Sequence, residues 1–190
     1  MKRTLRMIPC LLAGWLGGPA WAESYSIDSR HTFPVFEVSH YGFSIQRGRF
    51  SKVSGKLDLD LAGKLASVDI AIDTASVDMG FEDWNKHMRG ERFFQTDKHP
   101  QARFVARNFA IDLAAPAPVS GELTLLGVTR PVVLQVSQWR CAKHPILPRQ
   151  LCGADLQTTL KRSEFGMNYG IPGIGEDVRI VIAVEALKDS

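Results

Sequence analysis

Cysteine is scarce in this sequence, with three residues among 190. Cys10 lies in an apolar N-terminal run, which leaves Cys141 and Cys152 for a folded domain. No Cys-x-x-Cys pair occurs, and the single nearby histidine, His144, does not make a ligand set, which argues against a redox pair or a zinc site. In an oxidising compartment the two cysteines are expected to form a structural disulfide that contributes about 3 kcal/mol.

An excess of charge is also missing once the N-terminus is set aside. The whole chain has 23 Lys and Arg against 20 Asp and Glu, and the three basic residues Lys2, Arg3 and Arg6 account for the difference. Residues 23–190 therefore balance at 20 against 20. No basic stripe with interleaved aromatic residues occurs there, which argues against a nucleic-acid-binding surface.

The sequence has one long apolar run, and this run is too short to span a bilayer. Met7 to Leu16 follows the basic leader, and Gly17 to Pro19 break the run ahead of Ala22. This pattern predicts a signal peptide over residues 1–22, and it fits an uncleaved anchor less well because the apolar core is short. Residues 23–190 are expected to form one domain, since no linker, repeat or low-complexity tract divides them.

Catalytic motifs are absent as well. Gly-x-Ser-x-Gly, His-Glu-x-x-His and His-x-His do not occur, and the glycine-rich Tyr169–Gly175 segment lacks the strand and helix of a dinucleotide site. The pair Ser163-Glu164 lies in a turn-like segment, and Glu82-Asp83 is typical of a solvated helix face. The sequence therefore predicts no enzyme, no metal site and no cofactor, with a small enzyme for an apolar substrate as a remaining alternative.

Most of the chain alternates apolar and polar residues with the period of a β-strand. In Lys56–Leu61, for example, every second residue is leucine. About eight such runs are found: Val35–His40, Lys56–Leu61, Ser67–Asp73, Arg103–Ile111, Val119–Leu126, Val132–Trp139, Ala154–Leu160 and Val178–Glu185. One-sided strands joined by short turns predict an antiparallel sheet. The pattern leaves a sandwich and a barrel open, although the size of the apolar set favours closure into a barrel.

The segment Asp78–Pro100 interrupts this alternation. Its spacing predicts a short helix with Asp78 as N-cap and Gly90 as stop. Large apolar side chains mark one face of the helix and the turn after it: Phe81, Trp84, Met88, Phe93 and Phe94. A single helical insert in an all-β chain is expected to close one side of a cavity.

Short motifs along the whole of residues 25–178 resemble those of the YceI-like proteins. They are Tyr25-Ser-Ile-Asp28, Arg30-His31-Thr32, Phe36-x-Val38-x-His40-x-Gly42-Phe43-Ser44, Gly48-x-Phe50, Thr74-x-Ser76-Val77-Asp78, Lys86-His87-Met88-Arg89, Phe93-Phe94, Pro100-x-Ala102-x-Phe104, Gly121-x-Leu123-Thr124-Leu125-x-Gly127-Val128-Thr129-Arg130-Pro131, Ser163-Glu164-Phe165-Gly166 and Asp177-Val178. Each motif alone is weak, but their order and spacing together are specific.

The resemblance implies an all-β, eight-stranded antiparallel, lipocalin-like barrel with a short helical insert. It further implies an exported, usually periplasmic protein that binds a polyisoprenoid, a quinone or a similar amphiphilic lipid inside the barrel, as a carrier or reservoir. The chain departs from the common pattern at His99, where tyrosine is more frequent, and in the Cys141–Cys152 loop. A filled barrel that serves as a structural or protein-interaction module is the alternative, and a homodimer is compatible with the sequence.

The expected ligand site combines the apolar face of the strands with the insert. Its members are Phe36, Val38, Phe50, Val68, Ile70, Ile72, Trp84, Met88, Phe93, Phe94, Phe104, Leu123, Leu125, Val132, Leu134, Phe165, Ile180 and Ile182. Many of these could instead pack only against each other. Contacts to a polar head group are expected from His31, His40 and His87, because isolated histidines fit hydrogen bonding better than metal binding or catalysis.

Overall fold

The computed structural model describes residues 22–112 and 114–190. The predicted signal peptide therefore lies outside the described residues, except for Ala22. The strands are β1 (Glu23–Ile27), β2 (Phe33–His40), β3 (Ser44–Phe50), β4 (Val53–Asp60), β5 (Leu65–Asp73), β6 (Val77–Asp78), β7 (Gln101–Ala110), β8 (Val119–Leu125), β9 (Val128–Lys143), β10 (Gln150–Lys161) and β11 (Ile174–Lys188). One α-helix, α1 (Glu82–Arg89), and two short 3₁₀ helices, Thr74–Ser76 and Arg162–Phe165, complete the described fold.

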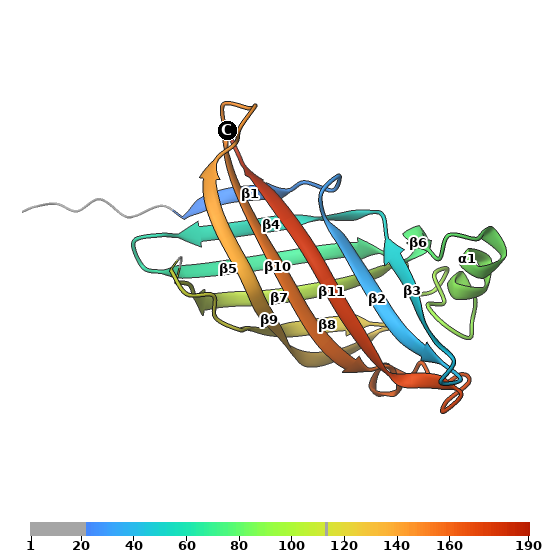
Figure 1. The fold of residues 1–190 in the computed structure, drawn as a ribbon. Coiled ribbons are helices and arrows are strands. Elements are labelled where there is room, and N and C mark those ends of the chain that lie inside the picture. Colours follow the sequence, from blue (N-terminus) through green and yellow to red (C-terminus); the bar gives the residue numbers. More distant parts are fainter. Residues whose placement is uncertain (1–21, 113) are drawn as a thin grey trace, which may run out of the picture.

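All the strands belong to one sheet that closes on itself (Figure 1). The first six segments occupy three strand positions of the barrel: β1 with β2, β3 with β4, and β5 with β6. Between the first two positions, β1 pairs with β4 and β2 pairs with β3. Between the second and third, β4 pairs with β5 and β3 pairs with β6. The strands β7 to β11 follow as antiparallel neighbours, and β11 pairs with both β1 and β2 to complete the ring. The prediction of an eight-stranded antiparallel barrel is confirmed.

Three apolar clusters follow one another along the barrel. The cluster at the helix end contains buried residues of β2, β3 and the insert, such as Phe36, Phe50 and Phe94. The middle cluster contains Phe104 and Leu134, and the last surrounds Tyr25 beside Cys152. We call the two ends the helix end and the hairpin end, after α1 and the β9–β10 hairpin (Figure 1).

The helical insert begins later than the sequence predicts. Phe81 is the N-cap residue and provides no side-chain cap, while Asp78 belongs to β6 and accepts a hydrogen bond from the Gly80 amide at 2.8 Å. The expected N-cap role of Asp78 is therefore wrong, because β3 holds this residue through the Asp78–Arg49 ion pair. Gly90 ends the helix as predicted.

The apolar face of α1 is only partly buried. Phe81 is 58% exposed and Trp84 is 43% exposed, whereas Met88 points into the cluster at the helix end. The helix has just eight residues, so only its last turn reaches the barrel. The turn after the helix supplies the remaining buried groups, Phe93 and Phe94.

A buried arginine holds the helix end together. Arg162 is 4% exposed, and its guanidinium donates hydrogen bonds to the carbonyl oxygens of Met167 at 2.8 Å, Ile174 at 2.9 Å and Gly175 at 2.8 Å. Burial lowers the pKa of Arg162 from its ordinary value, against the pull of Glu176. Three charge-assisted bonds thus fix the segment between Arg162 and β11, which includes the glycine-rich residues Tyr169–Gly175.

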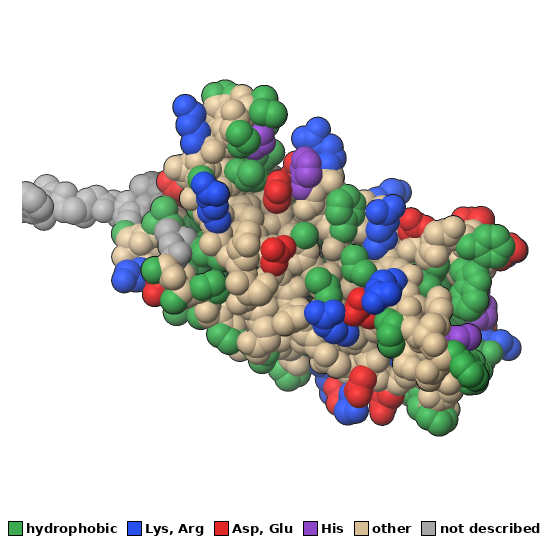
Figure 2. Space-filling model, viewed as in Figure 1, with side chains coloured by type: hydrophobic (Ala, Val, Ile, Leu, Met, Phe, Trp, Pro, Cys, Tyr) green, Lys and Arg blue, Asp and Glu red, His purple; other side chains and the backbone are tan. Residues whose placement is uncertain are grey.

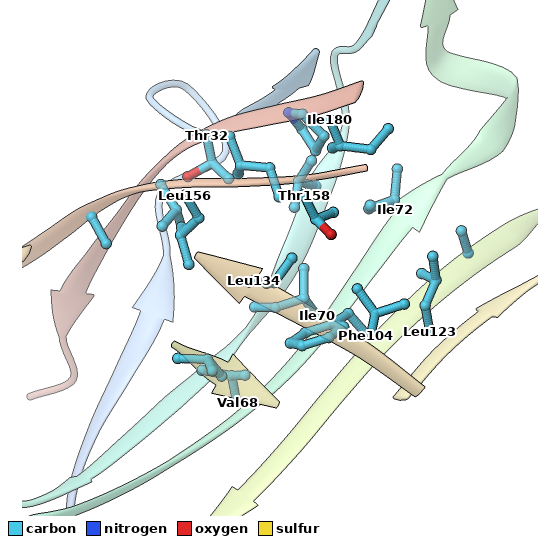
Figure 3. A pocket seen from close by; sticks show the side chains of 18 of the residues that line it. Thr32, Val68, Ile70, Ile72, Phe104, Leu123, Leu134, Leu156, Thr158 and Ile180 are labelled. Carbon is cyan, nitrogen blue, oxygen red and sulfur yellow. The ribbon is translucent and has the colours of Figure 1, made fainter. Parts of the chain in front are cut away.

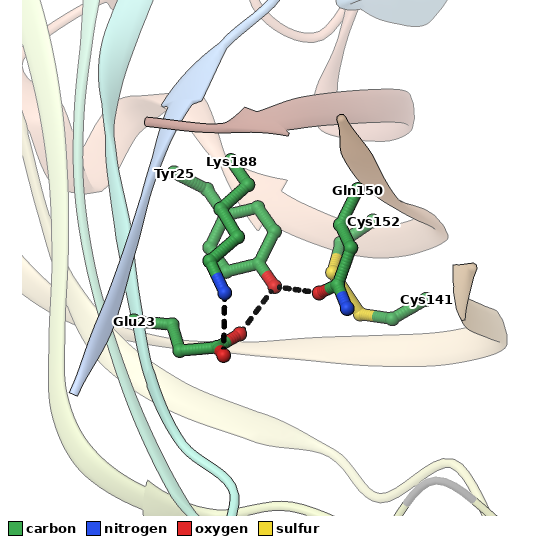
Figure 4. The surroundings of a disulfide bond; sticks show 6 residues. All are labelled: Glu23, Tyr25, Cys141, Gln150, Cys152 and Lys188. Atoms are coloured by element: carbon green, nitrogen blue, oxygen red, sulfur yellow. Dashed lines mark hydrogen bonds and ion pairs between the residues drawn. A yellow bond between two sulfur atoms is a disulfide. The ribbon is translucent and has the colours of Figure 1, made fainter. Parts of the chain in front are cut away.

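The cysteines lie at the other end of the molecule. Cys141 in β9 and Cys152 in β10 are direct cross-strand neighbours, and they form the predicted disulfide. Figure 4 shows Tyr25 beside the bond, with its hydroxyl 2.8 Å from Glu23 and 2.8 Å from Gln150. The hydroxyl has one proton, so at any moment it donates to one of two acceptor oxygens, Oε2 of Glu23 or Oε1 of Gln150. Lys188 completes the network by donating to Glu23.

Removing the disulfide should destabilise the hairpin end. Replacing both Cys141 and Cys152 by alanine is expected to lower the unfolding free energy by about 2 kcal/mol, because the cross-link restricts the unfolded chain. In a domain of this size the loss corresponds to a Tm lower by about 6 °C, measured by calorimetry. As a control, a reductant should bring the Tm of the unmodified protein to that of the variant. An unchanged Tm after complete reduction would contradict this role.

Removing the Arg162 side chain should cost more. The substitution Arg162→Met leaves one buried and two partly buried carbonyl groups without their donor, and we expect the unfolding free energy in urea to fall by about 3 kcal/mol. The matched control is Arg92→Met, since Arg92 is exposed and lies over the Tyr169 ring at 4.6 Å from its centroid. That control should change stability by only about 0.5 kcal/mol. Equal losses in the two variants would show that Arg162 does not hold this end.

Candidate functional site: an apolar cavity inside the barrel

A cavity of about 280 Å³ runs through the interior of the barrel. Figure 3 shows side chains of several strands turned toward it, including Val68, Ile70 and Ile72 from β5 and Phe104 from β7. Alternate residues of a strand point to the same face, so each strand contributes every second side chain to the wall. Aliphatic and aromatic groups make up nearly all of this wall.

Incomplete burial of inward-facing residues shows that the barrel is hollow. Val68, Ile70, Ile72, Ile180 and Ile182 face inward, yet the structure leaves each of them only half-buried. Side chains in a packed interior contact neighbours on all sides, whereas these border open space. The alternative of a filled barrel does not fit this structure.

All the residues expected to bind ligand line this cavity, except Trp84. Trp84 lies on the outside of the helix end, where its ring centroid is 6.4 Å from that of His40 and 6.5 Å from that of His87. It lies one turn before Met88 and so does not reach the barrel. The cavity is also lined by residues of β9 and β10 that were not predicted, among them Val136, Leu156 and Leu160, although the alternation of these strands indicates their inward position.

Aromatic rings close the cavity at the helix end. The ring centroids of Phe36, Phe50 and Phe94 lie 5.9 Å, 6.1 Å and 5.1 Å apart, mostly with tilted or edge-on geometry. Met88 and Phe93 pack in the same cluster. The insert therefore contributes to the closure of one end, as the sequence suggested.

At the hairpin end the cavity reaches the surface. Four of its lining residues are exposed, and all four belong to the end of β7 and the connection to β8: Ala110, Asp112, Pro116 and Ala117. We call this opening the mouth. The mouth lies at the opposite end of the barrel from the helical insert. None of its four residues is among the predicted site residues.

Polar groups in the wall are few. The Thr32 hydroxyl is satisfied by the backbone of Glu185, from whose N–H it accepts at 3.1 Å. The Thr158 side chain also faces the cavity (Figure 3). Near the hairpin end, the Trp139 indole N–H is the one buried side-chain polar atom without a partner among residues 22–112 and 114–190. A ligand in this cavity therefore meets an almost wholly apolar surface.

The three histidines expected to contact a head group do not line the cavity. His31 lies outside the barrel, with Nδ1 2.9 Å from the carboxylate of Asp28. Burial acts to raise the pKa of Asp28, but hydrogen bonds from His31 and Arg30 prevail and hold it at about 2. His40 packs against Tyr41, and His87 packs against Phe93 at the helix end.

The described residues provide neither a metal site nor a membrane helix. Within them, no group of three or more His, Cys, Asp or Glu side chains is placed to hold an ion. No helix in this part of the chain is long and apolar enough to cross a bilayer.

Comparison with known proteins agrees with this architecture. In sequence, the chain is 33% identical over 176 residues to a UPF0312 protein of Ectopseudomonas mendocina, covering 91% of this chain and 92% of the relative. A UPF0312 protein of Pectobacterium atrosepticum is 30% identical, with 99% of this chain and 98% of the relative covered.

Two solved structures share the fold. BcnA of Burkholderia cenocepacia superposes with a TM-score of 0.69 at 24% identity, covering 84% of this chain and 98% of BcnA. A polyisoprenoid binding domain from Saccharophagus degradans gives a TM-score of 0.66 at 20% identity, covering 88% and 99% of the two chains. The family model for the YceI-like domain matches residues 25–186, which form nearly the whole of the described barrel. The chain belongs to the YceI-like family.

Proposed function

We propose that this protein binds a long isoprenoid, or an amphiphilic lipid of similar shape, as a non-catalytic carrier or reservoir in the periplasm. The observation that carries the proposal is the hollow barrel with its apolar wall and single described mouth. The solved Saccharophagus degradans domain of the same fold is described as polyisoprenoid binding, which supports this class of ligand. The N-terminal signal pattern and the disulfide are both typical of exported proteins.

The size of the cavity indicates how much of a ligand it holds. An apolar cavity of about 150 Å³ accommodates benzene, so 280 Å³ corresponds to about eleven carbon atoms on that scale. This is about two isoprene units. Burying them supplies about 9 kcal/mol before ordering costs, close to the 8.2 kcal/mol that corresponds to micromolar binding. The rest of a longer chain, with its head group, then extends through the mouth.

A charge placed in the wall should abolish binding. In Ile70→Asp the carboxylate faces the cavity, where a ligand would have to bury it, and we expect the affinity for geranylgeraniol to fall at least about a hundredfold. Displacement of an apolar fluorescent dye measures this affinity. The matched control is Val133→Asp, since Val133 is an apolar strand residue that is 45% exposed and lies outside the cavity wall.

The control variant should bind geranylgeraniol as the unmodified protein does. Circular dichroism and thermal melting would show whether each variant is folded. A folded Ile70→Asp protein with unchanged affinity would exclude the barrel interior as the binding site.

The carrier role itself predicts a lipid bound in the cell. Protein purified from the periplasm of its own organism should release a stoichiometric prenyl lipid on organic extraction, identified by mass spectrometry against a mock purification. The absence of any enriched lipid, together with failure of an apolar dye to bind, would overturn the proposal.

A further inference from the structure

The β9–β10 hairpin leaves large apolar groups in water. It projects from the barrel near the C-terminus (Figure 1), and its tip is the sequence Pro145-Ile146-Leu147-Pro148. Ile146 is 86% exposed and Leu147 is 38% exposed. The Cys141–Cys152 disulfide holds the base of the hairpin, so the tip is presented by a cross-linked support.

The backbone N–H groups of this tip all have partners within the protein. The Nδ1 atom of His144 accepts hydrogen bonds from the N–H groups of Ile146 at 3.0 Å and Leu147 at 2.9 Å. The other two tip residues are prolines, which have no N–H. An unpaired backbone donor is costly in an apolar medium, so a tip without one can leave water more readily than an ordinary loop.

Positive charge surrounds the apolar tip. Arg140, Lys143 and Arg149 are exposed and take part in no ion pair among the described residues, and no Asp or Glu occurs between Arg140 and Cys152. Figure 2 shows hydrophobic side chains at the summit of the hairpin, with basic and histidine side chains beside them. Because residues 23–190 are neutral as a whole, the hairpin concentrates charge of one sign.

The hairpin rises from the end of the barrel at which the cavity opens. Trp139 and Cys152, at its base, both line the cavity. They pack in one apolar cluster with Phe109 and Ile111, which lead to the mouth. An object bound by the hairpin therefore lies on the same side of the molecule as the mouth.

We infer that this hairpin docks the protein on lipid bilayers that carry anionic head groups. Ile146 and Leu147 enter the interfacial layer, and Arg140, Lys143 and Arg149 lie at the level of the lipid phosphates. Basic residues beside a small apolar anchor match such a surface in both charge and polarity. Docking would bring the mouth next to the bilayer, where ligand could be exchanged. The exchange of ligand rests on the proposed function, whereas docking itself does not.

The helix end provides the matched control. Phe43 is 91% exposed, and Tyr41 and Phe81 are also exposed there. However, this end carries the acidic pair Glu82 and Asp83 together with its basic residues, so it lacks a charge of one sign. The variant Phe43→Ser removes as much exposed apolar surface as a tip variant without changing the hairpin.

The test is cosedimentation of the disulfide-bonded protein with phosphatidylcholine vesicles, with and without phosphatidylglycerol. The unmodified protein should bind the anionic vesicles and release them at high salt. Ile146→Ser should weaken binding roughly tenfold, and Lys143→Gln combined with Arg149→Gln roughly twentyfold. Phe43→Ser should bind as the unmodified protein does. All variants change exposed side chains, and thermal melting would verify their folding.

The outcomes separate docking from ligand binding. Failure of the unmodified protein to bind anionic vesicles at low salt would overturn the inference. The inference would also be overturned if Phe43→Ser lost vesicle binding while Ile146→Ser kept it. Ile70→Asp should lose geranylgeraniol but still dock, because its hairpin is intact. If the cavity proves to bind no lipid while the hairpin variants still lose the vesicles, the proposed function fails and the docking surface stands.

Discussion

The closure of the sheet through β11 is the constraint on which the rest of this structure depends. One edge of β11 pairs with β10, and its other edge is shared between β2 and β1, at residues 174–183 and 186–188. Glu185 of β11 lies between these two paired ranges, where β1 has ended and β2 has not begun, so its backbone N–H and C=O groups have no strand partner on this edge. Instead the Asp28 amide donates to the Glu185 carbonyl, and the Thr32 hydroxyl accepts from the Glu185 amide, so both groups of Glu185 are satisfied. The ring therefore closes without an unpaired edge at this point.

Closure fixes the space that side chains must fill, and these side chains do not fill it. An eight-stranded barrel has an interior just wide enough for side chains or a small ligand. Here many wall residues are of medium size, such as Ile70 and Ile180, and the rings of Phe36, Phe50 and Phe94 cluster at the helix end. The phenylalanine cluster and the Arg162 bonds consolidate that end.

The strands could be predicted because a single inward face imposes a period of two. Each alternating run lies in a different barrel strand. The strands β1 and β3 were not predicted, because β1 is short and β3 is mostly polar, so neither shows a clear alternation of apolar and polar residues. The alternation alone is compatible with a sandwich, so the barrel was predicted from the size of the apolar set and from the resemblance to a family. Trp84 was misplaced because helical spacing defines a face but not how far a short helix reaches. The mouth and the His144 bonds depend on loop geometry, which periodicity does not encode.

The two ends of the barrel differ, and this difference would decide which part of a lipid the cavity selects. In the proposed function, a tube closed at the helix end by Phe36, Phe50 and Phe94 and open beside Ala117 would admit and release a lipid chain through the same opening. The segment that enters first would leave last, and the innermost part of the bound chain would be its apolar terminus. Such a tube would recognise the first few units of a lipid chain and would be insensitive to how many units follow. Lipids of different lengths but with the same terminus would therefore look alike to it.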